Sequence, residues 1–167
     1  IELCLRLVDP VAVTCPNHTY ASVPMTFEKL KIQWAFHSIN WKDYYFIGNT
    51  NIIDGAVYWK QNGYLSNTLL CLSFQYKKHL NIGRGGMILL DNKEQYEKLL
   101  KMRYDGRTDD TPWAEQNIDT FGFHYYMTPE QAEIGLEKLK SARTTESKQW
   151  SSKDYPDLTQ MKVFDAK

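Results

Sequence analysis

Neither sign of charge is in excess in this sequence, since its 20 lysines and arginines balance 20 aspartates and glutamates. A chain without net positive charge lacks the electrostatic attraction that drives general binding to nucleic acids and to anionic membranes. The sequence also has no apolar run long enough to cross a bilayer and no visible signal peptide. We therefore expect neither a nucleic-acid partner nor a membrane association.

Cysteine is scarce as well. Cys4, Cys15 and Cys71 are odd in number, lie in apolar surroundings and have no C-x-x-C spacing. The histidines have no H-x-x-x-H spacing that would indicate a metal site. These features favour reduced, buried thiols, and we expect a cytoplasmic protein without a bound metal.

What the sequence does have is a composition typical of a packed core, with 43% apolar and 14% aromatic residues. Strand-like and helix-like patterns alternate along the chain, which predicts an α/β fold with a reduced sheet flanked by helices. We expect helices over 1–7, 20–30 (interrupted at Pro24), 92–104 and 129–139, and strands over 11–15, 31–36, 52–54, 69–74 and 87–90. The character of the chain changes near Gly106, which predicts a division into residues 1–105 and a short C-terminal part, 106–167.

The clearest helix start lies at Thr128, which is followed by Pro129 and Gln131 in the arrangement of a capping box. The apolar residues that should form the packed face of this helix are Ala132, Ile134, Gly135, Leu136 and Leu139. Residues 40–45 are polar and aromatic and are predicted to be irregular, and residues 105–119 are predicted to form a loop.

The stretch 69–86 carries the first candidate chemistry. A buried strand leads to Lys77 and Lys78, and glycines at 83, 85 and 86 let the backbone turn before the next apolar run. This pattern delivers a lysine to the edge of a sheet. On this stretch alone, a surface hairpin with two solvated lysines is the simpler interpretation.

Three other side chains change that balance. Asp54 ends a strand, Tyr20 follows a loop at another strand end, and Ser73 precedes Lys78 on the third strand. Asp54 alone would equally well cap a turn. Together, an amine, an acid, an aromatic ring and a hydroxyl suit an aromatic, aldehyde-bearing, phosphorylated cofactor.

The lysine stretch resembles a known signature. It reads Ser73-Phe74-Gln75-Tyr76-Lys77-Lys78 and continues after four residues with Gly83-Arg84-Gly85-Gly86. This is similar to the lysine motif of the DegT/DnrJ/EryC1/StrS family of pyridoxal-phosphate-dependent sugar aminotransferases, which have fold type I. The resemblance implies that pyridoxal 5′-phosphate forms a Schiff base with Lys78, and that Ser73 binds the cofactor phosphate.

Three further blocks follow in the family's order. Residues 18–22 resemble the block whose aromatic residue stacks on the cofactor ring, which implies this role for Tyr20. Residues 52–56 resemble the block whose aspartate pairs with the pyridine nitrogen, which implies this role for Asp54. In residues 122–132, His124 takes the place of an asparagine that reaches the cofactor phosphate of the partner subunit. The resemblance therefore implies a homodimer with shared active sites.

The implied activity is transfer of an amino group from an amino-acid donor to a keto sugar, usually nucleotide-linked, with Lys78 moving the proton as base and then as acid. The alternative is a non-catalytic, regulatory or structural descendant of the same fold that binds the cofactor. Departures from the family pattern at Val57 and Tyr126, and a connection between Phe36 and Ile52 that is shorter than in relatives, motivate this alternative.

Overall fold

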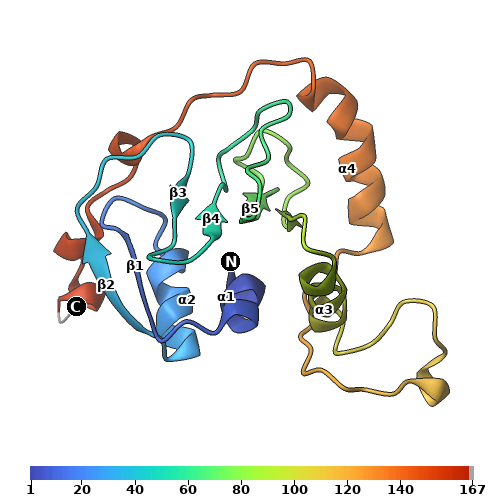
Figure 1. Cartoon of the computed structure of the whole chain (residues 1–167). Coiled ribbons are helices and arrows are strands. Elements are labelled where there is room, and N and C mark those ends of the chain that lie inside the picture. Colours follow the sequence, from blue (N-terminus) through green and yellow to red (C-terminus); the bar gives the residue numbers. More distant parts are fainter. Residues whose placement is uncertain (166–167) are drawn as a thin grey trace.

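The computed structural model describes residues 1–165 and has a mixed α/β architecture, as the sequence predicts (Figure 1). The helices are α1 (Glu2–Val8), α2 (Ser22–Leu30), α3 (Lys93–Arg103) and α4 (Pro129–Ala142), with short 3-10 turns η1 (Trp113–Glu115), η2 (Ser152–Asp154), η3 (Leu158–Gln160) and η4 (Lys162–Phe164). The strands are β1 (Ala12–Pro16), β2 (Gln33–His37), β3 (Tyr45–Phe46), β4 (Ile52–Asp54), β5 (Leu69–Ser73) and β6 (Gly86–Leu89).

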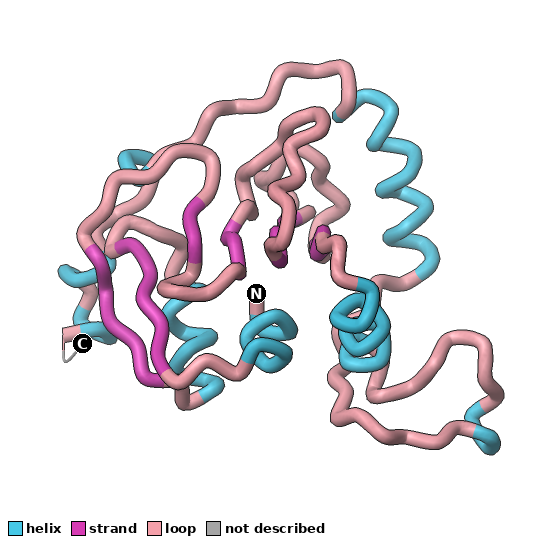
Figure 2. Tube along the Cα trace, in the orientation of Figure 1, coloured by secondary structure: helices cyan, strands magenta, loops and turns pink. Residues whose placement is uncertain are grey.

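The strands form two sheets. β1 and β2 pair in parallel, and a second sheet has the order β3-β4-β5-β6. In that sheet β4 and β5 are parallel, so Asp54 and the end of β5 reach the same edge, while β3 and β6 run antiparallel to their neighbours. Long loops, shown in pink in Figure 2, connect these short strands. The arrangement brings the carboxyl ends of β4 and β5 together, where ligands bind in open α/β sheets.

Two predictions about the first half of the chain need correction. α2 is not interrupted at Pro24, because this residue lies in the first helical turn, where its missing N–H has no partner to lose. Residues 40–45 are not wholly irregular, because Tyr45 begins the edge strand β3 and pairs with Asp54. The strand β3 places the Tyr45 side chain, which the sequence did not single out, opposite Asp54.

The main core lies between α1, α2, α3 and the strands. Its fully buried side chains include Phe27, Leu5, Ile47, Ile52 and Leu69. All three cysteines are free and buried, as predicted. The Sγ atoms of Cys4 and Cys71 lie 3.5 Å apart, so these two thiols join α1 to β5.

A smaller apolar cluster joins α4 to the loop that follows β5. Its buried members are Phe74, Leu80, Ile82 and Ala142. The capping box at Thr128 and Gln131 is present, which confirms the predicted helix start. The predicted packed face is wrong in part, because Ile134 and Leu136 are 43% and 67% exposed and only the neighbouring face of α4 meets the cluster.

The segment after α4 returns across the molecule to β2 (Figure 1). Its backbone hydrogen-bonds to the first third of the chain: Ser152 N–H donates to Trp41 O over 3.0 Å, Asp43 N–H donates to Trp150 O over 2.8 Å, and Leu158 N–H donates to Asn17 O over 2.9 Å. Leu158 and Phe164 are buried, so this segment is part of the fold. Among residues 1–165, no helix combines the length and apolar character needed to span a bilayer.

Candidate active site

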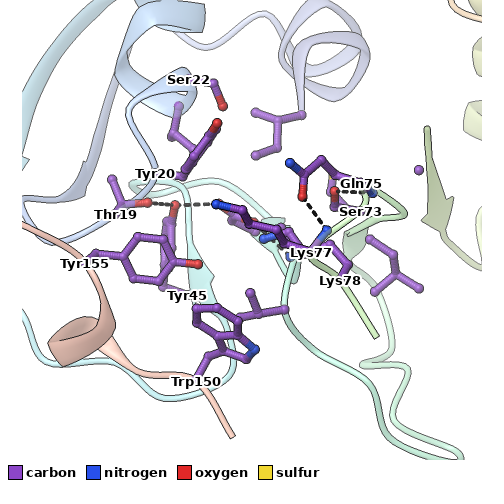
Figure 3. Close-up of a pocket in the computed structure, with 18 of the residues that line it drawn as sticks. Thr19, Tyr20, Ser22, Tyr45, Ser73, Gln75, Lys77, Lys78, Trp150 and Tyr155 are labelled. Atoms are coloured by element: carbon purple, nitrogen blue, oxygen red, sulfur yellow. Dashed lines mark hydrogen bonds between the residues drawn. The ribbon is translucent and has the colours of Figure 1, made fainter. Parts of the chain in front are cut away.

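A cavity of about 640 Å³ lies at the edge where β4 and β5 end. Its walls come from the first turn of α2, from β3 and β4, from the segment after β5, and from residues 150–155. Figure 3 shows Lys77 and Lys78 on one side and the aromatic side chains of Tyr45, Tyr155 and Trp150 on another. Four of the five predicted site residues, Tyr20, Asp54, Ser73 and Lys78, line this cavity.

Asp54 is 7% exposed and is held by two hydrogen bonds. Its Oδ1 accepts the backbone N–H of Ala56 over 2.9 Å, and its Oδ2 accepts the Tyr45 hydroxyl over 2.5 Å. The apolar residues Ile52 and Ile53 bury β4 and so fix the backbone at the point where the aspartate emerges. The carboxylate therefore enters the cavity in one defined orientation.

Lys78 lies in a loop whose ends are tied together. Phe74 N–H donates to Gly85 O over 2.9 Å and Tyr76 N–H donates to Gly83 O over 3.1 Å. Both glycines have a positive φ, 87° at Gly83 and 125° at Gly85, which other residues rarely adopt. The predicted glycine turn is therefore present, and it returns the chain directly to β6.

Partial burial lowers the pKa of the Lys78 amine below its ordinary value, and the negative charge of Asp54 opposes this change. The Lys78 Nζ atom also lies 5.7 Å from the centre of the Trp150 ring. A lowered pKa leaves a larger fraction of the amine neutral, which is the form that attacks an aldehyde. Lys78 thus has the burial and the acidic neighbour of a reactive lysine.

The other two predicted residues lie on the rim and the floor of the cavity. Tyr20 is 61% exposed, so its ring face is accessible to a flat ligand. The Ser73 hydroxyl is half-buried at the end of β5 and accepts the Gln75 N–H over 3.4 Å. Its own hydrogen can therefore be donated to a ligand.

The fifth predicted residue, His124, does not line the cavity. Its side chain is 74% exposed, and its Nδ1 atom lies 3.0 Å from Asp105 Oδ2. Its Nε2 atom lies 3.0 Å from the Tyr126 hydroxyl. The structure therefore does not bring His124 together with the other four residues within one chain.

The sequence did not single out several aromatic residues of the cavity wall. Tyr45, Trp150 and Tyr155 line the cavity because distant segments pack there. The rings of Tyr45 and Tyr155 lie on Trp41, with centroid distances of 5.2 and 5.4 Å. Burial raises the pKa of the Tyr155 hydroxyl to about 12. The only signal in the sequence was the aromatic density around these positions.

The residues present fit pyridoxal 5′-phosphate. The cavity offers an amine with a lowered pKa, a buried carboxylate, an accessible aromatic ring and a free hydroxyl hydrogen. When bound, this cofactor supplies an aldehyde that condenses with amines and a protonated ring that withdraws electrons from the adjacent carbon. Within residues 1–165, no group of three or more metal-ligating side chains is placed to hold an ion.

The fold is that of fold type I pyridoxal-phosphate-dependent aminotransferases. AtS13 from Actinomadura melliaura superposes with a TM-score of 0.75 at 19% identity, over 86% of this chain and 53% of that chain. PseC of Helicobacter pylori, an aminotransferase involved in the biosynthesis of pseudoaminic acid, superposes with a TM-score of 0.67 at 14% identity, over 86% of this chain and 51% of that chain. This chain thus spans about half the length of these structures.

The sequence assigns the family within that fold class. The model of the DegT/DnrJ/EryC1/StrS aminotransferase family matches residues 53–156, and the chain belongs to this family. An uncharacterized protein of Methanocaldococcus jannaschii is 34% identical over 109 residues, which cover 60% of this chain and 28% of that protein. The predicted family and fold class are therefore confirmed.

Proposed function

We propose that this chain binds pyridoxal 5′-phosphate through Lys78 and takes part in amino-group transfer from an amino-acid donor to a keto sugar, usually nucleotide-linked. One observation carries the proposal: the partly buried Lys78 amine and the buried Asp54 carboxylate line the same cavity at the ends of neighbouring parallel strands. The family to which the chain belongs is one of aminotransferases.

In this proposal each cavity residue has one task. Lys78 Nζ would anchor the cofactor and, as a free amine, would accept and return the proton at the reacting carbon. Asp54 keeps a proton on the pyridine nitrogen, because an anion beside that nitrogen stabilises its charged form. Tyr20 covers the ring face, and the Ser73 hydroxyl donates to the phosphate.

His124 has a separate place in the proposal. It is exposed and lies outside the cavity of its own chain. As the family resemblance implies, we assign His124 to contact with the cofactor phosphate that a second copy of the chain binds in a homodimer. A monomer in solution at all concentrations that support activity would contradict this assignment.

A second candidate function is cofactor binding without amino transfer. Val57, which stands where many relatives have a glutamine or histidine, lines the cavity. A valine cannot hydrogen-bond to the ring hydroxyl of the cofactor. This candidate predicts Lys78-dependent binding and no turnover.

The test begins with purified protein and added pyridoxal 5′-phosphate. We expect the visible absorbance of a Schiff base, and borohydride reduction followed by peptide mass analysis should place the modification on Lys78. Lys78→Ala should abolish the absorbance and the modification, whereas the matched variant Lys77→Ala should retain both. A modification on Lys77, or none at all, would overturn the assignment.

The transfer step is tested separately. The cofactor-loaded protein is incubated with glutamate or glutamine and a panel of nucleotide-linked keto sugars, and the aminated product is measured by mass spectrometry. Product that disappears in Lys78→Ala supports amino transfer. Binding without product across the panel favours the second candidate.

A further inference from the structure

The Tyr45 hydroxyl makes the shortest hydrogen bond to the carboxylate of Asp54. The distance from Tyr45 Oη to Asp54 Oδ2 is 2.5 Å, which lies in the range of hydrogen bonds to an ionised oxygen. The Tyr45 side chain is 5% exposed, so bulk water does not compete for this bond. Neither partner is a surface residue that happens to meet the other.

The sheet itself creates this contact. Tyr45 in β3 and Asp54 in β4 are directly opposite each other in the antiparallel register. Opposite residues of an antiparallel pair point to the same face of the sheet, with their Cβ atoms about 5 Å apart. The connection between β2 and β4 therefore adds an edge strand that carries a tyrosine to the aspartate.

A second hydroxyl fixes the direction of the bond. The Thr19 Oγ1 atom lies 2.5 Å from Tyr45 Oη, and Thr19 is 2% exposed. Because Tyr45 gives its one hydrogen to Asp54, Thr19 must be the donor in this second bond. Thr19 also directly precedes Tyr20, the proposed stacking residue, so one chain of hydrogen bonds joins both sides of the cavity.

The phenol remains a donor under ordinary conditions. Burial and the neighbouring Asp54 carboxylate hold the pKa of the Tyr45 hydroxyl well above its usual range. The Tyr45 ring is also fixed in place, because it packs against Trp41, whose Nε1–H donates to His18 O over 2.7 Å. The tyrosine thus has a fixed ring and a fixed proton.

We propose that Tyr45 is a positioning residue: its hydroxyl, held by Thr19, orients the Asp54 carboxylate toward the cofactor ring nitrogen. This inference rests on the proposed function, because it assigns Asp54 to the pyridine nitrogen. It adds a residue outside the four motif blocks of the sequence. Tyr45 itself acts only through Asp54.

The first measurement needs no cofactor. A short, buried O–H···O bond to a carboxylate gives a far-downfield hydroxyl proton in the ¹H NMR spectrum of the protein. We expect this signal in the wild type and in Tyr44→Phe, and its loss in Tyr45→Phe. Tyr44 is a matched control because it precedes Tyr45 and packs its ring against Phe46 and Tyr58.

The second measurement uses pyridoxal 5′-phosphate labelled with ¹⁵N in the ring. Tyr45→Phe should still react through Lys78 but should weaken cofactor binding about tenfold, which corresponds to about 1.4 kcal/mol. The ¹⁵N signal of the bound ring should move toward its unprotonated position. Thr19→Val should weaken cofactor binding by about threefold or less and should move the ¹⁵N signal in the same direction as Tyr45→Phe does. Tyr44→Phe should change neither the affinity nor the ¹⁵N signal.

The outcomes separate the inference from the function on which it rests. Wild-type protein that binds no pyridoxal 5′-phosphate would overturn the proposed function and this inference with it. Normal wild-type binding, together with unchanged affinity and an unchanged ¹⁵N signal in Tyr45→Phe, would overturn the inference alone. A purely packing role for Tyr45 predicts that second result, because phenylalanine keeps the ring.

Discussion

Polar side chains are buried in the cavity but exposed in the loop between α3 and α4. In the cavity, Asp54, Tyr45 and Thr19 are buried and share one chain of hydrogen bonds. In the outer loop, residues 104–128, the His124 side chain is exposed and contacts Asp105 at the other end of the loop. Figure 1 shows this loop projecting away from the sheets.

Apolar side chains follow the same division. Phe27 of α2 is fully buried in the main core, whereas Trp113 and Phe121 in the outer loop are 68% and 93% exposed. Buried groups contribute to stability through packing, and exposed groups contribute little. The cavity therefore has its structural support within the chain, whereas Trp113 and Phe121 of the outer loop are exposed to solvent.

The largest effect should come from Phe27→Ala. Removing this fully buried ring, which packs against Trp34 at a centroid distance of 5.9 Å, should lower the free energy of unfolding by about 3–5 kcal/mol. The matched variant Phe121→Ala should change it by less than about 0.5 kcal/mol. Urea unfolding followed by circular dichroism measures both, and similar losses for the two variants would break the comparison.

The next effect concerns activity. Asp54→Asn keeps the shape of the side chain but removes its charge, so transfer should fall about a hundredfold or more, equivalent to at least about 2.7 kcal/mol, while some cofactor stays bound. Asp91→Asn is the control, because Asp91 also accepts a backbone N–H, from Asn67, on an exposed surface. Steady-state transfer rates at saturating cofactor provide the measurement. Full activity of Asp54→Asn would contradict the role assigned to this carboxylate.

A smaller effect should appear at high pH. The pKa of Tyr155 is raised from its ordinary value near 10 to about 12, so the folded protein holds this proton more tightly than the unfolded chain does. Its contribution to stability is fully present below pH 10 and is lost as the pH rises through 12. After allowance for partial exposure, we expect a loss of about 1 kcal/mol beyond that of Tyr155→Phe. Equal pH profiles of unfolding for the two proteins would disprove this.

The smallest effect should come from His124→Ala. The contact between His124 and Asp105 is exposed, and exposed pairs of this kind contribute between zero and about 1 kcal/mol. We expect the free energy of unfolding, measured at low protein concentration, to change by less than about 0.5 kcal/mol. A loss above 1 kcal/mol would show that the outer loop unfolds together with the cavity.

The sequence predicted the parts of the site that lie in local motifs. The resemblance to the family's lysine motif selected Lys78 through its spacing to Ser73 and Gly83, and the structure brings Lys78 and Ser73 into the cavity with Asp54. The helix start at Thr128 was predictable because a capping box needs only neighbouring residues. Features of this kind depend only on residues that are close together in the sequence.

The remaining cavity residues depend on contacts between distant segments. Tyr45 meets Asp54 only through the register of two short strands, and a shift by one residue would turn its side chain to the other face. Trp150 and Tyr155 reach the cavity because the last part of the chain returns to Trp41. No periodicity within a single segment predicts such pairings.

The return of residues 150–155 to the cavity has a consequence for the order of synthesis. A ribosome synthesises the chain from the N-terminus. Asp54 and Lys78 therefore emerge before Trp150 and Tyr155, which line the same cavity. Until residues 150–155 have emerged, the part of the cavity wall that they form is absent, and Lys78 lacks its contact with Trp150. Small aldehydes would therefore reach Lys78 more easily on a stalled nascent chain than on the released protein.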